Sequence, residues 1–177
     1  MRTFLIFLIV PAAAALAQEG PLSAFNKRAY GQVSSWILAS ADKMPEANYS
    51  FRPSDDVRSF GQIVGHVADA QFYFCSVMLG EKFQPRNIEK TKTAKADLVG
   101  ALKEAGTYCG RAYDSMSDAT GTAMVKFGAE EMPKLSLAGV NVAHLAEHYG
   151  NLVTYLRMKK IVPPSTEAMA AMQQQKK

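Results

Sequence analysis

The residues of this chain whose type and spacing best suit a ligand-binding or catalytic role are its histidines. The 177-residue sequence contains only three, and His144 and His148 lie four residues apart in "NVAHLAEHYG". Residues four apart share one face of an α-helix, so both imidazoles would point the same way. Neutral imidazoles bind zinc, nickel, copper or iron. The pair alone is weak evidence, because such a spacing also arises by chance and a lone buried histidine usually serves the core.

The segment around this pair carries a polar strip between two packing faces. As a helix over about 135–160, it would present leucines on one side and small residues such as Gly139 and Gly150 on the other. The strip between them consists of Asn141, His144, Glu147, His148, Asn151 and Tyr155. A polar strip flanked by two packing surfaces needs hydrogen-bond or ligand partners.

The third histidine strengthens the metal hypothesis. His66 falls on the inward side of a helix predicted over 59–79, so it can meet the pair if the two helices touch. Three imidazoles leave coordination positions open for water or substrate, as in catalytic rather than structural sites. We expect Asp69, Glu147 and Asn151 to orient an imidazole or a bound water from outside the ligand set.

The sequence predicts that four long helices position these residues. Hydrophobic periodicity predicts helices over about 22–44, 59–79, 93–116 and 135–160, with a connection at 117–134 that contains a short extended piece at "AMVKF". Pro163 and Pro164 end the last helix, and we expect a C-terminal tail over 164–177 that is frayed at "AMQQQKK". The sequence therefore predicts one all-α domain over 22–163, a four-helix bundle.

The N-terminus has the pattern of a secretory signal peptide. A positive Arg2, an apolar run "TFLIFLIV" and a small-residue Ala-Leu-Ala site predict cleavage before Gln18, with residues 1–17 removed. The alternative is an uncleaved membrane anchor, although Pro11 interrupts a run that is already short for a span. We expect a periplasmic or secreted protein without a membrane attachment after cleavage.

The charge pattern argues against a nucleic-acid partner. The formal net charge is +4, and it falls to about +3 when Arg2 is removed. The lysines are scattered, and no basic stripe with interleaved aromatic residues is present. A solvated surface explains these charges better.

Two stretches of the sequence resemble the signature regions of the DinB/YfiT-like metalloenzymes. They are "YSFRPSDDVRSFGQIVGHVADAQFYFC" and "NVAHLAEHYGNLVTYLRMKKIVPPS". The resemblance covers about residues 22–163 and rests on the loop proline, the histidine pattern and the terminal "VPP", which occur in the family's order. It implies a four-helix bundle that binds a divalent metal, such as zinc, nickel, iron or manganese, through His66, His144 and His148.

The resemblance implies a metal-dependent transferase or hydrolase of unknown small-molecule substrate. Some relatives are thiol-dependent transferases, but an exported protein departs from the cytoplasmic members. The alternative is a non-catalytic module that binds a metal or small ligand, and small bundles of this kind often form homodimers. "HLAEH" also matches the H-x-x-E-H peptidase pattern. We reject that reading, because only Glu167 lies beyond the helix as the required downstream carboxylate.

The two cysteines allow two readings. Cys75 comes nine residues after His66 and points to the opposite side of its helix, about 180° around the axis, so it is a poor ligand candidate. Cys109 falls on the packing face of the third helix. They would meet if the second and third helices run parallel, and they would be far apart in an antiparallel hairpin. Because the family departs from simple up-down order and export favours oxidation, we predict a Cys75–Cys109 disulfide. Two buried thiols are the alternative.

Overall fold

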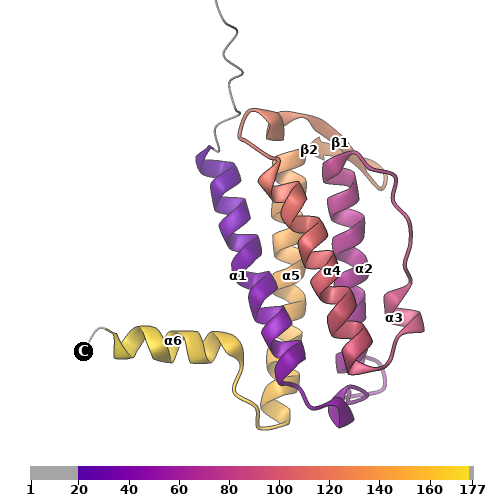
Figure 1. The fold of residues 1–177 in the computed structure, drawn as a ribbon, viewed down its shortest axis with the longest axis vertical. Helices are drawn as coiled ribbons and strands as arrows, with labels where there is room; N and C mark the ends of the chain where they lie inside the picture. Colours follow the sequence, from indigo (N-terminus) through magenta and orange to yellow (C-terminus); the bar gives the residue numbers. More distant parts are fainter. Residues whose placement is uncertain (1–19, 176–177) are drawn as a thin grey trace, which may run out of the picture.

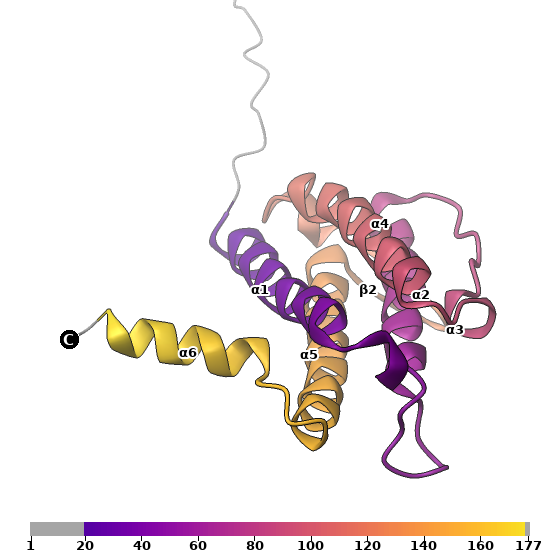
Figure 2. The ribbon, with the colours of Figure 1, turned by 60° about the horizontal axis from the view of Figure 1, so that its bottom comes forward.

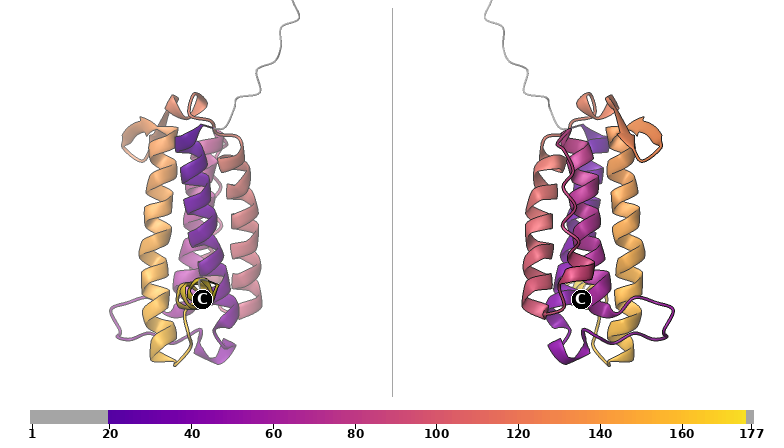
Figure 3. Two further views of the ribbon diagram at one scale, coloured as in Figure 1. Left: turned by 90° about the vertical axis from the view of Figure 1, so that its left-hand side faces the viewer. Right: turned by 90° about the vertical axis from the view of Figure 1, so that its right-hand side faces the viewer.

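Four long helices form the protein, as predicted. The structure is a computed structural model that describes residues 20–175. The four helices are α1 (Pro21–Lys43), α2 (Phe60–Leu79), α4 (Lys95–Asp114) and α5 (Lys134–Met158). Figures 1 and 3 show that α1 and α5 run in one direction while α2 and α4 run in the other. The bundle is therefore not a simple up-down arrangement, because α2 and α4 are parallel.

The connections contain short elements, most of which were not predicted. A long crossover leads from α2 to α4 along the outside of the bundle and includes α3 (Ile88–Thr91). An antiparallel hairpin of β1 (Met124–Phe127) and β2 (Glu130–Pro133) lies between α4 and α5. Of these, only β1 matches the extended piece expected at "AMVKF". Single 3₁₀ turns occur at Glu46–Asn48 and Thr120–Thr122.

Local sequence signals set the ends of α2. The Ser59 hydroxyl accepts a hydrogen bond from the Gln62 backbone N–H at 3.2 Å, and the Gln62 side chain accepts one from the Ser59 N–H at 2.8 Å. This capping box satisfies two of the free N–H groups at the helix start. Gly80 ends the helix with φ +70°, a left-handed conformation that glycine adopts without strain. The position of His66 within α2 is thus fixed from both ends.

The core lies between the four helices and includes most of the predicted apolar positions, although Phe25, expected on the inward face of the first helix, is 63% exposed. On α5, the four fully buried leucines are Leu137, Leu145, Leu152 and Leu156. Each buried leucine contributes about 1.5–3 kcal/mol relative to exposure. Their burial fixes the rotation of α5 about its axis, and so directs the polar strip of this helix toward α2.

A disulfide between Cys75 and Cys109 joins the parallel helices α2 and α4. Their Cα atoms are 5.2 Å apart, and both residues are fully buried. The two cysteines occupy nearly equivalent depths in their helices, which is possible only because the long crossover makes α2 and α4 parallel.

The chain end differs from the expected frayed tail. Residues Pro164–Gln174 form α6, which projects sideways from the bundle (Figures 1 and 2). Its first turn is attached, because Pro164 is buried and the Ser165 N–H donates to the Tyr149 hydroxyl at 2.8 Å. Glu167 also pairs with Lys43 of α1. A proline at the first helical position favours a new helix start, which explains why Pro164 begins a helix after the break.

The predicted signal peptide, residues 1–17, lies outside the described residues. Within 20–175, no helix has both the length and the apolar character needed to cross a bilayer.

Candidate metal centre

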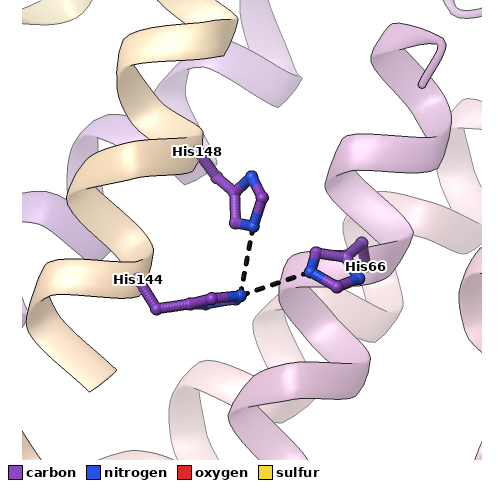
Figure 4. Close-up of side chains that lie close together, drawn as sticks. All are labelled: His66, His144 and His148. Atoms are coloured by element: carbon purple, nitrogen blue, oxygen red, sulfur yellow. Dashed lines mark hydrogen bonds between the residues drawn. The ribbon is translucent and has the colours of Figure 1, made fainter. Parts of the chain in front are cut away.

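The structure brings the three histidines together between α2 and α5. His66 points from α2 toward α5, and His144 and His148 point back from successive turns of α5 (Figure 4). The Nε2 atom of His144 lies 3.2 Å from Nε2 of His66 and 3.1 Å from Nε2 of His148. One nitrogen from each ring lies within 4.8 Å of the other two. These residues are the ones that the sequence singled out.

The distances from His144 Nε2 to the other two Nε2 atoms fit a single ion. Three nitrogens, each about 2.1 Å from one ion and about 90–109° apart, are separated by about 3.0–3.4 Å. The two Nε2–Nε2 distances of 3.1 and 3.2 Å fall in this range. The same distances also allow imidazoles to share a proton in an N–H···N hydrogen bond. In both arrangements, the three rings must point their Nε2 atoms toward one another.

Glu89 contacts the ring nitrogen of His66 that does not face the other two histidines. Its Oε2 lies 3.1 Å from His66 Nδ1. A carboxylate accepts, so Nδ1 carries the proton and Nε2 of a neutral ring keeps its lone pair toward the other histidines. The other oxygen of Glu89 accepts from Arg58 Nε at 2.8 Å. A carboxylate behind a ligating histidine is a recurrent feature of protein metal sites.

The other two histidines have weaker outer partners. The Asn151 side-chain amide lies 3.5 Å from His148 Nδ1, at the limit of hydrogen-bond distance. The Nδ1 atom of His144 is buried and has no hydrogen-bond partner among residues 20–175. Of the three outer residues predicted from the sequence, Asn151 thus lies closest to the expected place.

Asp69 and Glu147 act differently from the expectation. Asp69 accepts from the backbone N–H groups of Ile88 and Glu89, both at 3.0 Å, and so holds α3 rather than a ring nitrogen. The reason is that the crossover passes over this part of α2 and supplies unpaired N–H groups. Glu147 is exposed and lines a pocket beside His148.

Sequence reasoning missed Glu89 and Arg58. Glu89 lies in the irregular crossover and Arg58 in the loop before α2, where no periodicity or motif marks a residue. No signal in the sequence would have found either of them, because their place depends on how these two segments pack.

Burial keeps two of the imidazoles neutral. It lowers the pKa of His148 to about 4, with the neighbouring His144 and His66 as further causes. Burial also lowers the pKa of His144, and the charges of His66 and Arg58 act in the same direction. Since a charged imidazole cannot ligate, both rings have lone pairs available at neutral pH.

The cluster is open on one side and covered on another. A pocket of about 550 Å³ lies beside His148. Its lining residues are Pro53, Asp56, Val57, Arg58, Ile63, Glu89, Glu147, His148, Asn151 and Tyr155. On another side, the Phe74 ring lies 5.5 Å from the His144 ring and stacks on Phe127 of the hairpin. A small molecule can therefore approach from the pocket.

Comparison with known proteins agrees with the fold. The family model described as the DinB superfamily matches residues 32–152. The chain belongs to the DinB superfamily. The solved structure of a DinB-like protein from Bacillus cereus is similar to this DinB protein, with a TM-score of 0.69 and 16% identity over 78% of this chain and 93% of the other. At that identity the likeness concerns the fold. No curated protein matches the chain.

Proposed function

We propose that this DinB protein binds one divalent metal ion through Nε2 of His66, His144 and His148, and uses it in the hydrolysis or thiol-dependent transfer of a small molecule. The observation that supports the proposal best is the convergence of three histidine nitrogens, with His144 Nε2 at ligand spacing from the other two Nε2 atoms and the Glu89 carboxylate beside His66 Nδ1. Zinc, nickel, iron and manganese are the candidate ions.

A metal at this position would polarise a substrate oxygen or lower the pKa of a bound water or thiol. The chain's own residues would supply the remaining functions. The pocket beside His148 offers the Asn151 amide and the Glu147 carboxylate to hold a small substrate or accept a proton. The aromatic pair Phe74 and Phe127 excludes water from the His144 side.

A second candidate is a non-catalytic module that captures a metal or small ligand. Its support comes from the two carboxylates near the cluster. Glu89 is already engaged by His66 and by Arg58, whereas Glu147 is exposed to solvent. Turnover distinguishes the two candidates. If metal raises the melting temperature but no hydrolase or thiol-transfer substrate reacts, the module is the better description.

Metal content tests the proposal directly. The chain from Gln18 onward is purified without a histidine tag and analysed for metals beside His66→Ala and the exposed control Lys103→Ala. We expect about one equivalent of a divalent metal in the parent and the control, and a loss of most of it in His66→Ala. If the parent binds no divalent metal even after titration with zinc and nickel, the proposal is wrong.

We also propose that the protein is exported and processed after Ala17. The N-terminal pattern supports this, and so does the Cys75–Cys109 disulfide, because disulfides persist in oxidising compartments. Expression of the full chain in a bacterial host, followed by intact-mass analysis of periplasmic and cytoplasmic fractions, tests it. We expect a species that begins at Gln18 in the periplasm. Unprocessed chain confined to the cytoplasm would contradict export.

A further inference from the structure

The crossover segment around α3 contacts the metal centre through one side chain, Glu89. We propose that Glu89 is a positioning residue that holds His66 in the ligating tautomer, and that Asp69 and Gly65 of α2 hold Glu89 in place. This inference rests on the proposed metal-binding function and adds to it the residues that orient one of the three ligands.

Both oxygens of the Glu89 carboxylate are engaged. Oε2 accepts from His66 Nδ1 at 3.1 Å, and Oε1 accepts from Arg58 Nε at 2.8 Å. The Glu89 side chain is only 23% exposed. Two partners from different segments restrict the rotamer, so the carboxylate is held in the direction that His66 requires.

The backbone of Glu89 is also fixed. Asp69 Oδ1 accepts from Ile88 N and Asp69 Oδ2 from Glu89 N, both at 3.0 Å. These are N–H groups of the first turn of α3, and the negative carboxylate serves as the helix cap that α3 otherwise lacks. Ile88 is 2% exposed and anchors the same turn in the core. Asp69 follows His66 by about one helical turn, so one stretch of α2 carries both the ligand and the clamp.

Gly65 permits the close approach of the two segments. A Cβ atom at this position would lie 2.7 Å from Glu89 Cα and 3.0 Å from Glu89 N. Both atoms belong to the backbone, so no side-chain movement would relieve the clash. α3 can lie against α2 at this level only because residue 65 is glycine.

The consequence for the site is chemical as well as structural. A neutral imidazole carries its proton on either nitrogen, and only the Nδ1–H form of His66 directs a lone pair at the cluster. The carboxylate favours that form and makes the ring a more basic ligand. A purely structural role, in which Glu89 merely fastens the crossover to Arg58, would leave the tautomer of His66 unchanged.

Variants of Glu89 separate these roles. Glu89→Ala and Glu89→Gln are compared with Glu81→Gln, a matched control on the same crossover whose carboxylate accepts from the Tyr108 hydroxyl at 2.7 Å. Zinc affinity is measured by competition with a chromophoric chelator. We expect about a 10- to 100-fold loss for Glu89→Ala, a smaller loss for Glu89→Gln and none for Glu81→Gln.

A second measurement reads the tautomer without any metal. The chain has only three histidines, so long-range ¹H–¹⁵N spectra of the ¹⁵N-histidine-labelled, metal-free protein at about pH 8 resolve each ring. We expect His66 as Nδ1–H in the parent and a shift toward Nε2–H in Glu89→Ala. Asp69→Asn and Gly65→Ala, which displace α3 rather than remove the carboxylate, should shift it the same way.

The two measurements test the positioning role of Glu89 and the metal-binding function separately. If His66 keeps its tautomer in Glu89→Ala and zinc affinity stays within about two-fold of the Glu81→Gln value, the positioning role is wrong. If the parent binds no zinc at all, the proposed metal function is wrong, but the tautomer spectra still decide whether Glu89 orients His66. A melting curve for each variant verifies that it is folded.

Discussion

The burial of His148 makes the stability of the metal-free protein depend on pH. His148 is only 5% exposed, and burial lowers the pKa of its imidazole to about 4. In the unfolded chain the pKa returns to about 6.5, so between about pH 6.5 and 4 the unfolded state binds a proton that the folded state does not. Stability is therefore full above about pH 6.5 and falls as the pH drops toward 4.

We predict that acidification from about pH 7.5 to 4.5 lowers the unfolding free energy of the metal-free protein by about 1–3 kcal/mol through this group. Urea denaturation in the presence of a chelator measures it. His148→Gln removes the titrating group, so its loss over the same range should be smaller than that of the parent. Equal losses in the two proteins would show that His148 is protonated in the folded state without penalty.

At the same scale, the sequence predicted the histidines but not their partners. His144 and His148 were recognisable because four-residue spacing on a helix fixes a common direction, and His66 because it follows a recognisable helix start at Ser59. Glu89 was not recognisable, since its approach to His66 depends on a non-local contact at Gly65. Asp69 was identified as an outer residue, but its partner is α3, an element that the sequence did not reveal.

Among the elements, α2 and α4 are a parallel pair that the disulfide cross-links. The Cys75–Cys109 bond closes a loop with a sequence separation of 34 residues. For a loop of that length, restriction of the unfolded chain gives about 2–4 kcal/mol of stability. We predict a loss of that size in the double variant Cys75→Ser, Cys109→Ser, measured by urea denaturation.

The same variant should retain zinc affinity, because Cys75 lies on the opposite side of α2 from His66, about 180° around the helix axis, and bonds to α4 rather than α5. A large loss of zinc affinity in a protein that still melts cooperatively would mean that the disulfide, and not the α2–α5 packing, sets the position of His66.

α6 contributes little beyond its first turn. Pro164 is its only buried residue, and the Lys43–Glu167 pair is partly exposed to solvent. Exposed ion pairs typically give less than about 1 kcal/mol. We predict that truncation after Ser165 changes the unfolding free energy by less than about 1 kcal/mol and leaves zinc affinity unaltered, as checked by urea denaturation and chelator competition. A larger loss of stability would show that α6 packs on the bundle in solution.

Most of the short elements could not be predicted from the sequence. The four long helices have strong periodicity and recognisable ends such as Ser59 and Gly80, so their existence and bounds could be predicted. α3 and β2 have four residues each, too few for a period, and they form because neighbouring parts of the fold supply partners. The parallel order of α2 and α4 was inferred through the family resemblance, because local patterns carry no information on helix direction.

For the whole molecule, the proposed metal ion would be a cross-link between distant parts of the chain. His66 and His144 are separated by 78 residues, and they come from two helices that run in opposite directions. An unfolded chain cannot hold the three nitrogens together, so a bound ion favours the folded state by mass action. The stabilisation depends on the free metal concentration relative to the dissociation constant, and not on new contacts.

We predict that zinc at about a hundred times its dissociation constant raises the unfolding free energy by about 2.7 kcal/mol. Thermal or urea unfolding with and without zinc measures the change at about pH 7.5, where burial keeps His144 and His148 neutral. His66→Ala should lose most of the stabilisation, and Lys103→Ala should retain it. If His66→Ala gains as much from zinc as the parent does, the ion binds at the His144–His148 turn of α5 alone, and the cross-link between α2 and α5 does not exist.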